Sequence, residues 1–150
     1  MIDTTISQEE IDALVQLATK AARAYIHGDM GTYFSLIRHG DDYTLMSPFG
    51  GAVERGFDTS PEHLAALEQF FRSGEAEFEV AETYASGNLV VIVAIERQHG
   101  EIADLPDQDL SLRVTWVFQR DESGWRQVHR HADPLVHPIT LDQLAALLRG

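Results

Sequence analysis

Residues 111–134 constrain the fold more than any other part of this sequence. They predict two long strands joined by a tight turn at residues 121–124, because Gly124 can adopt the positive φ that such turns need. Alternate side chains of a strand point to opposite faces. One predicted face is apolar except for one cation, and its members are Val114, Trp116, Phe118, Val128, Arg130 and Ala132. The opposite face is mixed and contains Arg113, Thr115, Val117, Gln119, Trp125, Gln127, His129, His131 and Asp133.

Three amphipathic helices are predicted before these strands. Each begins at a residue with a capping side chain and ends at a glycine, which commonly terminates helices. In the first, Ser7 and Glu10 have the spacing of a capping box, and in the third Pro61 occupies the first helical position. The predicted helices extend over residues 7–28, 29–40 and 60–74.

The strand pattern begins with a short segment at residues 42–48 and becomes continuous from Glu75 onward. Residues 89–95 are apolar at every position, which predicts a strand covered on both faces. Residues 100–109 are expected to be an acidic, solvated connection, and residues 140–148 a terminal helix. This order predicts one α+β domain over residues 1–150, with helices on one face of a curved antiparallel sheet.

The net charge of −13 argues against nucleic acid or an anionic membrane surface as a partner. The chain has no cysteine, so disulfides and Cys-ligated zinc are excluded. No apolar run has the length of a membrane span. Residues 1–10 are polar and acidic, unlike a signal peptide, so the expected location is cytoplasmic.

Three segments carry a resemblance to a known family: residues 27–29, residues 42–51 and residues 120–133. In their order they resemble the NTF2-like superfamily, which includes SnoaL-like polyketide cyclases, ketosteroid isomerases and scytalone dehydratase. The last segment is also similar to the association domain of calcium/calmodulin-dependent kinases. The resemblance implies a cone in which a curved antiparallel sheet and three N-terminal helices enclose a hydrophobic pocket. It also implies a homodimer formed through the outer face of the sheet, but it implies no particular reaction.

The resemblance also identifies three positions at which the isomerases carry their reactive groups. Their aspartate base matches Ser47, their oxyanion-binding tyrosine matches Ala21, and their protonated aspartate matches Trp116. None of these three positions therefore carries the residue that the isomerases use. Steroid isomerisation by that mechanism is not expected.

Glu96 and Arg130 are the candidate catalytic residues, because each is a charged group among apolar strand residues. One interpretation is an internal ion pair that only closes the pocket. In a second, Arg130 meets a ligand carboxylate or enolate while Glu96 transfers a proton. In a third, one of the two lies at the rim in water. The residues expected to line the pocket around a small apolar or aromatic ligand are Tyr33, Ser47, Phe49, Phe70, Trp116 and Val128.

His129, His131 and Asp133 follow one another at two-residue steps on the mixed face. Two histidines at this spacing can bind zinc with a third ligand, but hydrogen bonding across a subunit interface is the preferred interpretation. No metal or cofactor is predicted. Two functions remain open: an isomerase, cyclase or dehydratase acting by acid–base chemistry, and a non-catalytic ligand-binding or oligomerisation module.

Overall fold

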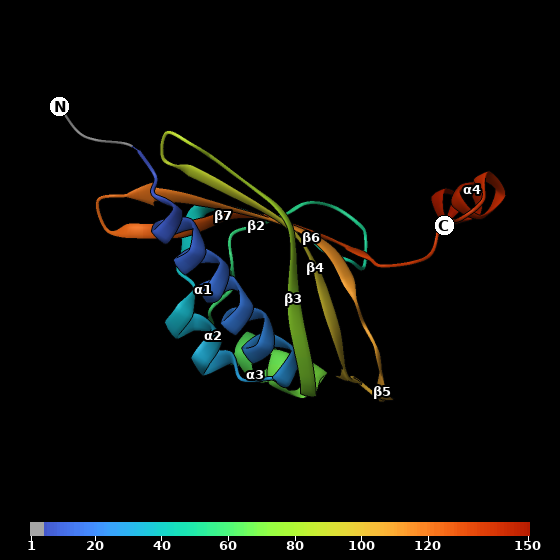
Figure 1. The fold of residues 1–150 in the computed structure, drawn as a ribbon. Helices are drawn as coiled ribbons and strands as arrows, with labels where there is room; N and C mark the ends of the chain where they lie inside the picture. The colour runs from blue at the N-terminus through green and yellow to red at the C-terminus, as the bar shows by residue number, and fades with distance from the viewer. Residues whose placement is uncertain (1–4) are drawn as a thin grey trace.

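The structure is a computed structural model that describes residues 5–150, so the first four residues of the polar N-terminal segment lie outside it. Four helices and seven strands form one α+β unit in the described residues (Figure 1). In chain order they are α1 (Gln8–His27), α2 (Met30–Leu36), β1 (His39–Met46), β2 (Glu54–Arg55), α3 (Pro61–Phe70), β3 (Phe71–Ser86), β4 (Leu89–Ile102), β5 (Leu105–Asp109), β6 (Leu112–Asp121), β7 (Gly124–Pro134) and α4 (Leu141–Arg149).

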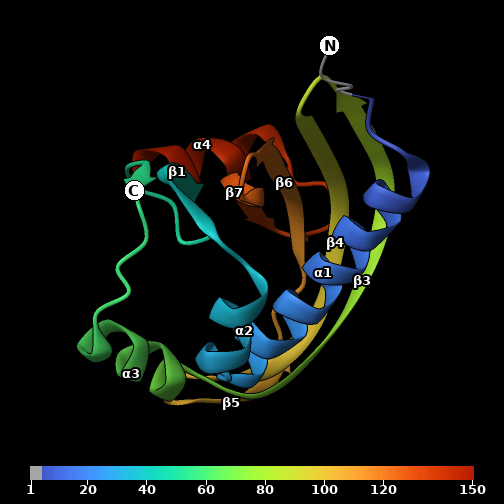
Figure 2. The same cartoon turned by 90° about the vertical axis from the view of Figure 1, so that its left-hand side faces the viewer.

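All seven strands belong to one sheet, in the order β2-β1-β7-β6-β4-β3, with β5 paired to β4. Neighbouring strands are antiparallel except β1 and β7, which are parallel. The sheet is strongly curved, and Figure 2 shows α1 and α2 within the curve while α3 stands farther out. The predicted cone of three N-terminal helices and a curved sheet is therefore confirmed, and the sheet, predicted to be antiparallel, contains one parallel pair, β1 and β7.

Helix α1 begins and ends as its sequence predicts. Ser7 and Glu10 form the capping box, and the backbone N–H of Gly28 donates to the carbonyls of Ala24 and Tyr25. Four of the side chains that α1 buries are alanines, which bring its axis close to the sheet; the buried set is Leu14, Ala18, Ala21, Ala22, Ala24 and Ile26. None of the helices within residues 5–150 combines the length and the apolar composition needed to cross a membrane.

Four predicted boundaries are wrong, and strand pairing explains them. Helix α2 ends at Leu36 rather than near residue 40, because the chain enters strand β1 at His39. Strand β1 begins at His39, earlier than residue 42, and its first residue pairs with Gln127 of β7. Helix α3 ends at Phe70 because Phe71 and Arg72 already pair with the end of β4. Residues 100–109 are the end of β4, a turn and β5, because backbone pairing continues through them.

A bulge in β7 changes the face on which two predicted residues lie. Val117 of β6 pairs with His129, whereas the next residue, Phe118, pairs with Gln127. Val128 is therefore the extra residue, and alternation on its N-terminal side is reversed. Gln127 is fully buried and Val128 only partly, so the prediction that Val128 shares the apolar face with Trp116 and Arg130 is wrong.

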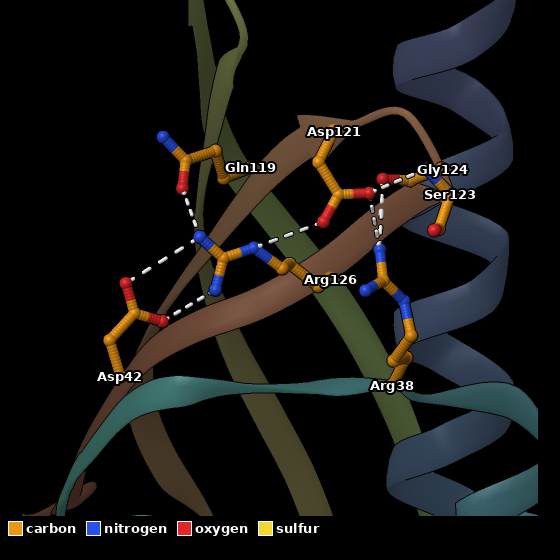
Figure 3. A network of polar contacts seen from close by, with 7 residues as sticks. All are labelled: Arg38, Asp42, Gln119, Asp121, Ser123, Gly124 and Arg126. Carbon is orange, nitrogen blue, oxygen red and sulfur yellow. Dashed lines mark hydrogen bonds and ion pairs between the residues drawn. The ribbon is translucent and has the colours of Figure 1, made fainter.

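A polar network joins the β6–β7 turn to β1 (Figure 3). Arg126 of β7 donates to Asp42 of β1 over 2.5 Å and to Gln119 of β6 over 2.6 Å. On the other side of the turn, Arg38 donates to Asp121 over 2.8 Å. The network lies where the β1–β7 pairing is interrupted between His39 and Thr44, and it supplies side-chain bonds where backbone bonds are missing.

Gly28 allows a close contact that no other residue would permit. Its φ is +87°, and a Cβ atom there would lie 2.2 Å from the carbonyl oxygen of Phe71. We expect Gly28→Ala to lower the free energy of unfolding by about 3 kcal/mol, measured by urea denaturation.

The matched control is Gly87→Ala in the β3–β4 turn. Gly87 also has a positive φ, +61°, but a Cβ atom there would have nothing within 4 Å. This variant should lose about 1 kcal/mol from backbone strain alone. Equal losses in the two variants would contradict the contact between Gly28 and Phe71.

Candidate functional site

A cavity of about 680 Å³ lies between the helices and the inner face of the sheet. Its walls are largely aromatic and aliphatic, and every element of the described chain except β5 and α4 contributes to them. Seven of the eight predicted site residues line it: Tyr33, Ser47, Phe49, Phe70, Glu96, Trp116 and Arg130. Val128 does not, because of the β7 bulge.

Glu96 is the charged group most deeply buried in the cavity wall. Its residue is 2% exposed, and each carboxylate oxygen has a partner. Oε1 accepts a hydrogen bond from Trp116 Nε1 over 3.1 Å, and Oε2 accepts one from Arg130 Nη2 over 3.0 Å. The side chains of β4, β6 and β7 are thereby joined through one carboxylate.

Arg130 keeps part of its guanidinium open to the cavity. Its side chain is 18% exposed, against 3% for Glu96, and its Cζ lies 5.7 Å from the centre of the Trp116 ring. Burial is the largest single influence on the pKa of Arg130 and acts to lower it. Glu96 and the nearby tyrosines together outweigh burial and raise the pKa of Arg130 above its ordinary value. Arg130 is therefore a cation at every physiological pH.

These contacts bear on the three interpretations of the pair. The internal ion pair is present in the structure, and a position of Glu96 at a wet rim is wrong because the carboxylate is buried. Arg130 uses one N–H on Glu96, and its other N–H groups make no hydrogen bond within residues 5–150. The pair can therefore close the wall and still present donors to a ligand.

Two tyrosines that sequence reasoning did not place in the site also line the cavity. Tyr25 of α1 is partly buried and Tyr43 of β1 is buried, and burial raises the pKa of each hydroxyl while Arg130 lowers it. Three of the four tyrosines of the chain lie between residues 25 and 43. The sequence signal that could have identified Tyr25 and Tyr43 as site residues is this concentration of tyrosines within apolar patterns.

His39 lies behind the cavity wall and supports it. Its Nε2 is 3.0 Å from the Tyr33 hydroxyl, and its ring stacks on Phe57 at 4.7 Å between centres. Burial lowers the pKa of His39 to about 4, although the neighbouring Gln127 amide opposes this shift. His39 is thus neutral at pH 7. The Gln127 amide has no hydrogen-bond partner of good geometry within residues 5–150.

Three further histidines have defined positions. His63 lines the cavity from α3. His129 Nδ1 lies 2.7 Å from Thr44 Oγ1, and His131 Nε2 lies 3.2 Å from Asp133 Oδ1, so both have partners within the chain. Within residues 5–150 no group of three or more histidine, aspartate and glutamate side chains is placed to hold a metal ion.

A second hollow, of about 820 Å³, opens at the end of α1 beside β3, β4 and β5. Its lining is mostly charged and polar, and its main ion pair joins His99 to Asp107 at 2.9 Å in an exposed position. It holds no predicted site residue. The enclosed apolar cavity is the stronger candidate for a ligand site.

Comparison with known families gives one match to the sequence. The profile of the SnoaL-like domain matches residues 14–136. No curated protein sequence matches the chain.

Solved structures resemble the fold at low sequence identity. A protein from Streptomyces avermitilis, provisionally named a dehydratase of the NTF2-like family, has a TM-score of 0.69 and 18% identity, covering 88% of this chain and 100% of its own. A ketosteroid isomerase-like protein from Erwinia carotovora has a TM-score of 0.65 and 15% identity, covering 87% of this chain and 100% of its own. The calcium/calmodulin-dependent kinase hub homology domain from Chlamydomonas reinhardtii has 0.64 and 15%, covering 84% and 98%. At these identities the likeness concerns the fold alone.

The lowered pKa of His39 predicts a specific pH dependence of stability. The unfolded state binds a proton near pH 6.5 and the folded state only near pH 4, so the stabilisation is complete above pH 6.5 and is lost as the pH falls to 4. A difference of this size corresponds to about 3 kcal/mol. We expect the free energy of unfolding of His39→Gln, measured by urea denaturation, to fall less between pH 6.5 and pH 4 than that of the wild type.

Carboxylates titrate in both proteins, so the difference between the two curves isolates His39. His137→Gln, on the exposed C-terminal segment, is the matched control and should follow the wild-type curve. Parallel curves for wild type and His39→Gln between pH 4 and 6.5 would show that His39 is not buried in the neutral form.

Proposed function

Because this chain belongs to the SnoaL-like domain family of the NTF2-like superfamily, we propose that it binds a small hydrophobic or aromatic ligand in the cavity of its cone. The observation that carries the proposal is the enclosed cavity of about 680 Å³, a size typical of small-molecule sites. The apolar body of a ligand would lie against the aromatic walls, and its orientation would be set by a few polar groups.

The apolar walls come from elements that are far apart in the sequence. Phe49 and Phe70 contact each other at 6.0 Å between ring centres on the α3 side, while Tyr43 and Trp116 line the cavity from the sheet. Phe49 is 69% exposed, which is unusual for a large aromatic residue beside a cavity. A bound ligand would cover part of this apolar surface, and that burial is the main expected source of affinity.

Ala66 provides a direct test, because it is exposed on α3 and also lines the cavity. We expect Ala66→Trp to fill the entrance and to weaken binding of 2-methylnaphthalene at least about tenfold, measured by quenching of tryptophan fluorescence. Ala65→Trp is the matched control, since Ala65 is exposed on the same helix but does not line the cavity. Equal affinities of the two variants, or no binding by the wild type, would overturn the proposal.

Catalysis by acid–base chemistry, of the isomerase, cyclase or dehydratase type, is the finer form of this proposal. Glu96 would transfer the proton and Arg130 would stabilise the anion. Each oxygen of Glu96 already accepts one hydrogen bond and its side chain is only 3% exposed, so little of the carboxylate is open to a ligand. This observation favours the second candidate, a non-catalytic binding module. Turnover of a ketone, enol or epoxide that is lost in Glu96→Gln would decide for the enzyme.

We also propose that the chain forms a homodimer through the outer face of the sheet. Side chains on that face are only half-buried although several are apolar; they include Val91, Val93, Ile95, Thr115 and Val117. Their neighbours His129 and His131 lie on the same face, opposite Val117 and Thr115. A second copy would cover this apolar strip.

Val93→Lys tests the dimer, because it places a charge at the centre of the strip. We expect the dissociation constant of the dimer to rise about tenfold, measured by sedimentation equilibrium. Val53→Lys, which changes an exposed valine outside this face, should leave the association unchanged. A wild-type chain that stays monomeric at micromolar concentration would refute the proposal.

A further inference from the structure

The buried charged pair at one end of the cavity presents hydrogen-bond donors and little acceptor surface, whereas the carboxylate of Glu54 lines the same cavity from an exposed position. Each oxygen of Glu96 accepts one hydrogen bond, one from Trp116 and the other from Arg130. Arg130 has donated one of its five N–H groups, and its side chain keeps an 18% exposed fraction. A ligand that reaches this end therefore meets a guanidinium with N–H groups to spare.

Two phenol hydroxyls lie near the same guanidinium. Tyr25 and Tyr43 line the cavity, and Arg130 is close enough to lower the pKa of each hydroxyl. Neither hydroxyl makes a hydrogen bond within residues 5–150. The buried side-chain polar atoms without a partner in this range are those of Gln127, so each tyrosine hydroxyl keeps some exposed surface, although Tyr43 as a whole is only 1% exposed.

The protonation states of these groups are set by their surroundings. Burial raises the pKa of both tyrosine hydroxyls above the ordinary value for tyrosine, so they stay protonated at neutral pH. Tyr33 differs, because its hydroxyl is already bonded to His39. The donors at this end are thus one cation and two neutral O–H groups, and the exposed Glu54 side chain is close enough to raise the pKa of both hydroxyls.

The number of free donors discriminates between ligand chemistries. A carbonyl oxygen has two lone pairs, whereas a carboxylate has about four and accepts two parallel bonds from arginine. Spare N–H groups of Arg130 together with two phenol hydroxyls exceed what a carbonyl can accept. A donor left unpaired in a closed site costs free energy, so a carboxylate satisfies this set better.

We propose that Arg130, Tyr25 and Tyr43 form a carboxylate-binding end of the cavity, which selects ligands with an acidic group on an aromatic or alicyclic body. This inference rests on the proposed function, since it names the class of ligand for the same cavity. Glu96 holds the guanidinium in place from behind and Trp116 covers its face, so Arg130 acts on the ligand from a fixed position. The body of the ligand then extends along the aromatic walls toward Phe49 and Phe70.

Three probes with one ring system separate the carboxylate from the apolar body. They are 2-naphthoate, 2-naphthamide and 2-methylnaphthalene, titrated into the wild-type protein at neutral pH by isothermal calorimetry. We expect 2-naphthoate to bind at least about tenfold more tightly than 2-naphthamide, because hydrogen bonds to a charged acceptor are the stronger ones. Equal affinity of these two probes would overturn the inference while leaving the proposed function intact.

Isosteric variants assign the effect to the tyrosines without removing the buried ion pair. Tyr43→Phe and Tyr25→Phe should each weaken 2-naphthoate about tenfold and leave 2-methylnaphthalene unchanged. Tyr84→Phe, which alters a tyrosine that is 60% exposed on β3, is the matched control and should bind like the wild type.

The outcomes distinguish this inference from the proposed function. If none of the three probes binds, the proposed function fails. If 2-naphthoate binds preferentially but is insensitive to both tyrosine variants, the assignment of the site to these hydroxyls is wrong.

Discussion

The ion pair between Glu96 and Arg130 is the interaction on which the inner side of this cone depends. A carboxylate at 2% exposure costs several kcal/mol unless it is paired and hydrogen-bonded. Here one oxygen faces Arg130 and the other Trp116, so both charges are compensated within the wall. Strands β4, β6 and β7 each contribute one of the three side chains. The sheet can therefore enclose a cavity without leaving an unpaired charge inside it.

The cavity exists because the helices lie at different distances from the sheet. The alanines of α1 bring that helix close to the strands and fill one side of the cone. Helix α3 has no buried residue, so the space between it and the sheet stays open. The network around Arg126 fastens β1 to the β6–β7 turn across an irregular pairing, and β1 carries Tyr43 into the wall (Figure 3). Packing thus decides where a ligand could lie, and the ion pair decides the polarity at one end.

Much of the site was predictable because the relevant patterns are local. The alternation in β6 placed Trp116 inside, and the charge of Glu96 stood out in an apolar strand. Val128 was misplaced because one extra residue in β7 reverses the alternation, and a bulge depends on how the partner strand pairs. Tyr25 and Tyr43 were missed for a related reason. Their places beside Arg130 result from the curvature of the sheet, which brings α1 and β1 to the same end of the cavity.

The sequence by itself determined the class of fold, the caps of α1, the turn at Gly124 and the presence of one cation on an apolar strand face. These features depend on side-chain periodicity and on backbone conformations of neighbouring residues, which short segments encode. Only the tertiary structure decided that β1 pairs with β7 in parallel, that Val128 is the bulged residue, and that Arg130 bonds Glu96 in the wall of a cavity also lined by Tyr25 and Tyr43. The residues concerned are tens of positions apart in the chain. Their meeting is set by the free energy of packing the whole sheet against its helices, which no local pattern contains.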